Sequence, residues 1–160
     1  MVWKKDEGAG MKSMWACHYL IGVVSAAQFP PIDDFLPESW HDDPRRDDIN
    51  RTTWLTLATW ARENGAVAAA LEMPWDSLPR IPGWERFKVA AKGPLTSAFV
   101  QAVSGLQPTA LELSDAAATP LFEQTNTWDD QRIFCSAPAA ALVRERLRSA
   151  FNADGLSLAW

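Results

Sequence analysis

The sequence predicts an α+β fold, a single domain in which about three helices pack on a small mixed or antiparallel sheet. Its 160 residues are 48 % hydrophobic and 22 % charged, the ordinary balance of one folded domain. Segments with helical and strand periodicity also alternate without a regular strand–helix–strand rhythm, which favours α+β over α/β. We therefore expect one domain over residues 1–160, with residues 1–10 as a flexible extension.

The first part of the chain contains an apolar run and then an acidic loop. Trp15 to Val24 fits either a buried strand or the core side of a helix. Met11 to Ala27 also has the order of a short signal peptide, so export is the alternative to the cytoplasmic location that we expect. The apolar run, about 11 residues, is shorter than the roughly 20 that span a bilayer. Prolines and carboxylates predict a loop from Ile32 to Asp48.

Capping residues and apolar periodicity predict three helices. The first helix runs from Asp47 or Asp48, whose carboxylate serves as its cap, to Asn64-Gly65. The second runs from Gly93-Pro94 to Pro108. The third runs from Ser136, whose hydroxyl serves as its cap, to Gly155. The side chains expected to face inward are Ile49, Thr53, Trp54, Leu57, Ala58 and Ala61, then Leu95, Phe99, Ala102, Val103 and Leu106, then Leu142, Val143, Leu147, Ala150 and Phe151.

Strands are expected between these helices, where apolar residues form short runs or alternate with polar ones. The predicted strands are 66–73, 86–91, 109–113, 132–135 and 156–160, and the predicted loops are 74–83 and 114–131.

The sequence contains no pattern typical of a catalytic, cofactor or metal site. The only two histidines are His18, in an apolar run, and His41, beside Asp42 and Asp43 on a segment that does not form a ligand set. Cys17 and Cys135 are predicted to be free, reduced and buried. No glycine motif for phosphate is present. We expect no enzyme activity, no cofactor and no metal.

The net charge of the chain is concentrated in one segment. Residues 33–48 contain seven acidic and two basic side chains, a local charge of −5 that equals the net charge of the whole protein. A solvated loop is one interpretation. The other is a docking surface for a basic protein partner, because clustered carboxylates attract cationic surfaces and repel nucleic acid.

Tryptophan is unusually frequent, with nine residues against one tyrosine. Several lie in predicted loops beside proline or acidic residues, where tryptophan often anchors an interface or pins a loop to the core. The predicted partner-binding residues are Asp33, Asp34, Trp40, His41, Asp42, Asp43, Asp47, Asp48, Trp75 and Trp128.

The C-terminal third resembles the ending of several bacterial immunity proteins, the cognate inhibitors of secreted or contact-dependent toxins. The resemblance lies in the segment Arg132 to Pro138, the helix Ala139 to Phe151 and the segment Gly155 to Leu158, about 30 residues in all. It implies a non-catalytic protein that occludes the active or substrate-binding surface of one toxin domain. No residue-level binding motif carries over.

Two other functions remain open at this stage. One is a small enzyme or ligand-binding domain with a pocket ringed by Trp75, Trp84 and Trp128. The other is a subunit of a larger assembly. We expect a protein toxin as the partner and neither nucleic acid nor membrane, while the sequence leaves homo-oligomerisation open.

Overall fold

The structure, a computed structural model, describes residues 29–33, 35–36, 40, 42–74, 83–87, 90–104, 106, 108–125, 130–156 and 158. In chain order the elements are β1 (Pro31–Ile32), α2 (Arg46–Glu63), β2 (Ala68–Glu72), β3 (Glu85–Phe87), β4 (Ala90–Pro94), α3 (Ser97–Val103), β5 (Ala110–Ser114), β6 (Pro120–Thr125), β7 (Asp130–Phe134) and α4 (Ala137–Ala153). Within the described residues, three helices and seven strands confirm the predicted α+β class, with a larger sheet than expected.

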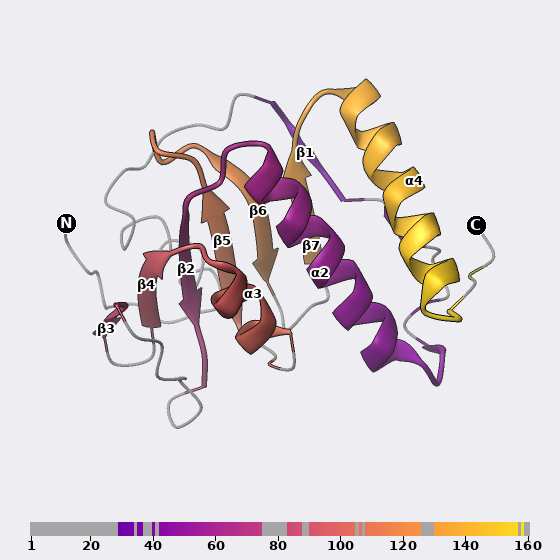
Figure 1. The fold of residues 1–160 in the computed structure, drawn as a ribbon, viewed down its shortest axis with the longest axis horizontal. Helices are drawn as coiled ribbons and strands as arrows, with labels where there is room; N and C mark the ends of the chain where they lie inside the picture. The colour runs from indigo at the N-terminus through magenta and orange to yellow at the C-terminus, as the bar shows by residue number, and fades with distance from the viewer. Residues whose placement is uncertain are drawn as a thin grey trace.

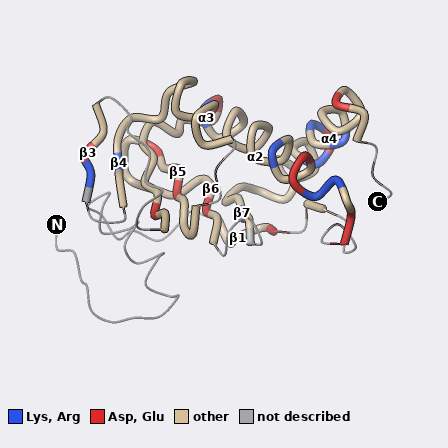
Figure 2. The backbone as a smooth tube through the Cα atoms, turned by 90° about the horizontal axis from the view of Figure 1, so that it is seen from below, with Lys and Arg blue, Asp and Glu red and all other residues tan. Residues whose placement is uncertain are grey.

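All seven strands belong to one antiparallel sheet, ordered β1-β7-β6-β5-β2-β4-β3. The three helices lie on one face of this sheet (Figures 1 and 2). The edge strands β1 and β3 are the shortest, with two and three residues.

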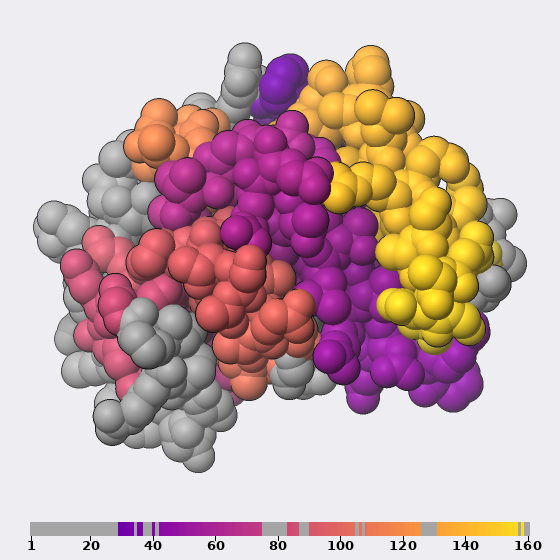
Figure 3. Space-filling view, in the orientation of Figure 1, coloured from indigo at the N-terminus to yellow at the C-terminus, as the bar shows by residue number. Residues whose placement is uncertain are grey.

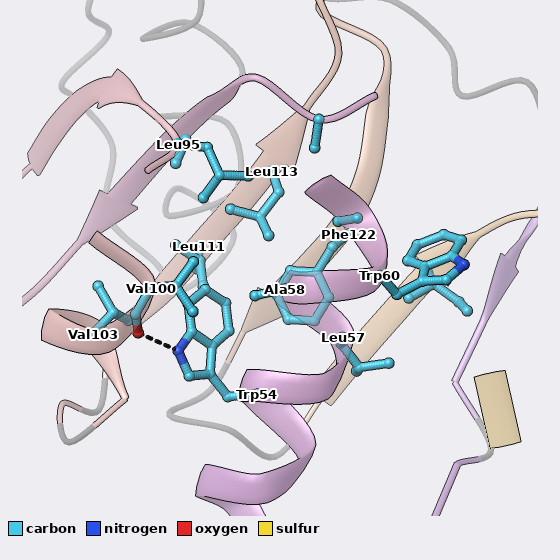
Figure 4. Close-up of a cluster of buried hydrophobic side chains, with 14 of the residues drawn as sticks. Trp54, Leu57, Ala58, Trp60, Leu95, Val100, Val103, Leu111, Leu113 and Phe122 are labelled. Carbon is cyan, nitrogen blue, oxygen red and sulfur yellow. Dashed lines mark hydrogen bonds between the residues drawn. The ribbon is translucent and has the colours of Figure 1, made fainter. Parts of the chain in front are cut away.

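The core lies between the helices and this face of the sheet. Strand register sets Leu113 opposite Phe122 and Phe122 opposite Ile133, so these buried side chains share one face. Trp54 of α2 meets the Phe122 ring edge-on at a centroid distance of 5.7 Å. Its indole N–H donates to the Val100 carbonyl of α3 at 3.0 Å, which joins two helices within the core (Figure 4).

Helix α2 confirms the predicted periodicity, and α4 confirms it at Val143, Leu147 and Phe151 but not at Leu142, which is exposed. All six apolar positions predicted for α2 are buried. In α4 the Ser136 hydroxyl accepts from the Ala139 N–H at 3.3 Å, as expected of the cap. The helix ends before Gly155, whose φ of +71° lies in the left-handed region that favours glycine.

Helix α3 begins later than predicted. Gly93 and Pro94 belong to β4, and the N-cap is Thr96, whose hydroxyl accepts from the Phe99 N–H at 3.1 Å. A local hydroxyl cap thus sets the start of the helix, whereas the proline ends a strand. The predicted inward position Ala102 is exposed.

Two loop predictions and one strand prediction were wrong in this part of the chain. The segment predicted as a loop over 114–131 contains β6, which was missed because its central residues Glu123 and Gln124 are polar although buried. The single strand predicted over 86–91 is divided between β3 and β4, which pair antiparallel with Phe87 opposite Ala90. The loop predicted from Ile32 to Asp48 begins with a strand residue, because Ile32 forms β1 with Pro31. This strand lies at an edge of the sheet, where proline is tolerated.

Several predicted segments lie wholly or partly outside the described residues. They are the apolar run 15–24, the signal-like segment 11–27 and most of the loop 74–83. For the predicted strand 156–160, Leu156 and Leu158 are described and neither is in a strand. Among the described helices, none combines the length and apolar character needed to cross a bilayer.

Candidate functional site

The acidic segment 33–48 leads directly into α2, and one of its carboxylates, Asp43, is paired within the segment. Asp43 Oδ1 accepts from the Arg45 backbone N–H at 2.8 Å and from Arg45 Nε at 3.1 Å, while Oδ2 accepts from the guanidinium at 2.9 Å. The Arg45 side-chain hydrogen bonds are the main reason that the pKa of Asp43 is lowered. Arg45 therefore offsets one of the carboxylates that the sequence assigned to the docking surface.

The prediction that a carboxylate caps α2 is wrong. The N-cap is Arg45, which makes no side-chain capping bond, and the Arg46 N–H donates to the Asp43 carbonyl at 3.0 Å. This turn starts the helix earlier, so Asp47 and Asp48 lie in its first turn. There the positive end of the helix dipole stabilises their charges.

Four predicted partner-binding carboxylates have exposed side chains, namely Asp33, Asp42, Asp47 and Asp48. Asp42, Asp47 and Asp48 lie at or just before the N-terminus of α2, and Asp33 follows β1. Figure 2 shows acidic and basic residues alternating along the start of α2, because Arg46 and Arg51 share this region. The surface is acidic but less uniformly so than composition suggested.

The prediction that Trp40 is a partner-binding anchor at the surface is also wrong. It is 8 % exposed and belongs to the hydrophobic core, because its large apolar ring is buried against other apolar side chains. Trp84 is also buried. Its ring stacks on Phe99 at a centroid distance of 4.4 Å, so it does not line an open pocket. Of the remaining predicted residues, Asp34, His41, Trp75 and Trp128 lie outside the described residues.

A groove lies between α2 and α4 on the surface of the described part of the chain. It has a volume of about 800 Å³ and appears as a hollow between the two helices in Figure 3. Residues from both helices line it, and they are Thr52, Leu55, Thr56, Thr59, Leu142, Glu145, Arg146, Ser149, Ala150, Ala153 and Asp154. We call this surface the α2–α4 groove.

Leu142 is the most informative residue of the α2–α4 groove. It was predicted to face inward, yet its side chain is 70 % exposed. The core of α4 uses Ala140, Val143, Leu147 and Phe151 instead, and these four cover the inward stripe without it. An exposed leucine next to a groove marks an apolar contact surface more strongly than an isolated leucine elsewhere does.

A second depression of about 430 Å³ continues the α2–α4 groove toward the acidic segment. It shares Thr52, Leu55 and Asp154 with the first and adds Asp48 and Arg51. The groove is therefore continuous with the exposed carboxylate of Asp48. Sequence reasoning missed the groove because it follows the second, weakly apolar stripes of two helices that are distant in sequence. The only local signal was the extra leucine at position 142.

The opposite face of the sheet carries a pair of carboxylates that the sequence reading also missed. Glu112 of β5 lies directly opposite Glu123 of β6, and they are 1 % and 8 % exposed. Arg132, opposite Glu123 on β7, brings its guanidinium to 4.0 Å from the Glu123 carboxylate. The alternation of Glu112 with Leu111 and Leu113 was the available signal, because it assigns the glutamate to the other face.

Groups that could perform chemistry are sparse in the described residues. No group of three or more His, Cys, Asp or Glu side chains within them is arranged to hold a metal ion. Cys135 is free and buried, as predicted, whereas Cys17 lies outside the described residues. Burial raises the pKa of the Cys135 thiol, and the Arg144 charge opposes this to a smaller extent. A raised thiol pKa disfavours the nucleophilic thiolate.

Comparisons of this chain with protein-family models, with curated proteins and with solved structures produced no match.

Proposed function

We propose that this protein is a non-catalytic immunity protein that binds a cognate bacterial toxin and occludes its active or substrate-binding surface. The observation that carries the proposal is the continuity of the α2–α4 groove with a second depression lined by Asp48, in the same segment as the exposed Asp42 and Asp47. Acidic groups beside a partly apolar groove offer both electrostatic steering and contact area to a basic protein surface. The proposal includes a cytoplasmic location, with export as its alternative.

The binding surface in this proposal differs from the one predicted from sequence. Trp40 is in the core, so exposed carboxylates and groove residues take the role assigned to it. Asp43 is paired with Arg45, so it contributes less to attraction of a cationic partner than Asp42, Asp47 and Asp48 do. The alternative of a tryptophan-ringed pocket is weakened by the buried stacking of Trp84 on Phe99.

The test is capture of the partner with the tagged full-length chain from its native cells. We expect one stoichiometric protein partner, which should be a toxin domain. The variant Asp42→Lys/Asp47→Lys/Asp48→Lys should lose that partner while keeping its circular dichroism spectrum. A matched pair, Asp48→Lys against Glu85→Lys, controls for charge, because Glu85 is exposed on β3 at the far edge of the sheet.

Each alternative outcome is informative. No partner, or a partner that the triple variant retains, would contradict the proposed binding surface. A homo-oligomer without another protein would favour a subunit of a larger assembly. Because surface charges are screened within about 10 Å at 0.1 M salt, the association rate should also fall as salt rises.

A further inference from the structure

Two side-chain contacts join α2 and α4 along the α2–α4 groove. At one end the Arg146 guanidinium pairs with the Glu63 carboxylate at 2.6 Å, and at the other the Thr52 hydroxyl donates to Asp154 Oδ2 at 2.7 Å. These contacts set α2 and α4 antiparallel, as Figure 1 shows. Along α4 the lining runs from Leu142 to Asp154, 12 positions apart, so the groove extends roughly 18 Å.

The lining of the groove is mostly uncharged. Thr59, Ser149 and Ala150 are short side chains within it, Leu55 lies near the Thr52 end, and Leu142 lies one turn of α4 beyond Arg146. The Thr59 hydroxyl donates to the Leu55 carbonyl of its own helix at 2.7 Å, so its hydrogen is already used. Short side chains between two helices allow a third helix to approach at the usual interaxial distance of about 8–10 Å.

The walls favour a helical occupant over an extended one. Extended peptides bind by completing a sheet edge through main-chain hydrogen bonds, whereas both walls here are helices whose main-chain groups bond within the helix. An amphipathic helix needs only an apolar seat for side chains at helical spacing, and Leu55 and Leu142 provide such a seat.

The charged side chains at the two ends of the groove indicate the charge of this occupant and the direction in which it lies. At the far end Arg146 is paired with Glu63, and next to it Arg148 is paired with Glu145. At the near end the groove is lined by Asp48 and Asp154 against one cation, Arg51. Exposed Asp47 and Asp42, with Arg46, adjoin this end, which therefore carries more carboxylates than guanidinium groups. A second copy of this chain would present the same acidic end, so a cationic segment is the better complement.

We propose that the α2–α4 groove seats a cationic amphipathic helix of the partner. Its apolar side chains lie against Leu55 and Leu142, and its basic residues lie toward Asp48 and Asp154. This inference rests on the proposed function, because it identifies the part of the partner that the immunity protein holds.

The experiment uses a defined probe with the full-length protein. The probe is a fluorescein-labelled peptide of four helical turns, with leucines along one face and lysines in one terminal turn. Binding is followed by fluorescence anisotropy. Leu142→Glu should weaken binding about tenfold or more, because it places a charge in the apolar seat. The matched control is Val67→Glu, since Val67 is also an exposed apolar residue but lies just before β2.

Two further arms test shape and charge separately. Ser149→Trp should fill the α2–α4 groove and weaken binding without removing any core side chain. A peptide with glutamate in place of each lysine should bind about tenfold more weakly or worse. Equal binding to Leu142→Glu and Val67→Glu, or indifference to the lysine replacement, would overturn the inference. A concentration-dependent dimer that Leu142→Glu abolishes would assign the groove to a second copy and overturn it too.

Failure of this inference is distinguishable from failure of the proposed function. If the captured partner binds Leu142→Glu normally but is lost with the Asp42, Asp47 and Asp48 reversals, the groove is not the seat and the immunity proposal stands. If no protein partner is captured at all, the immunity proposal fails whatever the peptide does.

Discussion

Substitution of Gly93 by alanine is expected to destabilise the fold through one side chain, Trp84. An ideal Cβ on Gly93 would meet the Trp84 indole at its Cδ1, at Cγ (2.5 Å) and at Nε1 (2.6 Å), below the 3.0 Å that real Cβ atoms reach. Register explains the contact, because Glu85 pairs with Lys92 and so Trp84 comes opposite Gly93. The φ of Gly93 is not positive, so space and not backbone conformation requires glycine here.

The magnitude follows from what holds the indole in place. Trp84 stacks on Phe99 with planes 19° apart, and its N–H donates to the Pro94 carbonyl at 3.2 Å. Displacing the ring would lose roughly 0.5–1.5 kcal/mol of stacking and about 1 kcal/mol of hydrogen bonding. Alanine in a strand regains about 0.5–1 kcal/mol relative to glycine. With the residual strain of overpacking, roughly 1–3 kcal/mol, the expected net loss is about 3 kcal/mol.

The assay is urea unfolding followed by far-ultraviolet circular dichroism, arranged as a double-mutant cycle. In a Trp84→Ala background the obstruction is gone, so Gly93→Ala should stabilise by about 0.5–1 kcal/mol. Trp84→Ala itself removes about 3–5 kcal/mol, and Trp84→Leu provides a milder background if the first is too unstable. An equal loss from Gly93→Ala with and without Trp84 would refute the steric explanation.

Three further predictions concern a cap, a charge pair and a thiol. Ser136→Ala should lower the free energy of unfolding by about 1 kcal/mol, whereas Ser136→Asp, which keeps a cap oxygen, should not; thermal unfolding of both variants checks this. The Arg45 contact lowers the pKa of Asp43, so its stabilisation is present above the unfolded pKa and is lost as pH falls through the folded one. Asp43→Asn should therefore reduce the loss of stability on acidification, measured by urea unfolding at several pH values, and an unchanged pH dependence would count against the pair. In a Cys17→Ser variant, Cys135 should react with iodoacetamide far more slowly in the native protein than in urea, because burial raises its pKa; equal rates, measured by mass spectrometry, would contradict this.

The helices were predictable where local chemistry decides their limits. Ser136 and Gly155 mark the ends of α4 by a hydroxyl cap and a left-handed glycine, and both signals are visible in the sequence. Strand β6 was not predictable in this way, because Glu123 and Gln124 are polar and are buried only by neighbours distant in sequence. Burial by tertiary contacts does not leave a periodic pattern in the strand itself.

The candidate site was predictable in its charge and not in its shape. Local composition identified the acidic approach to α2, including Asp47 and Asp48. The assignment of Trp40 to the surface was wrong, because a large aromatic ring in a short connection can turn back into the core. The α2–α4 groove forms only when α2 and α4 come together, although 73 residues of chain separate Glu63 from Ala137.

The two short edge strands have a consequence for how this protein behaves at high concentration. A long, flat outer strand is a template on which other chains add and aggregate. Here β1 contains only Pro31 and Ile32, and the proline has no N–H to offer an incoming strand. At the other edge, β3 has three residues and begins with the charged, exposed Glu85 and Arg86. Within the described residues, both borders of the sheet thus resist growth into larger β-aggregates.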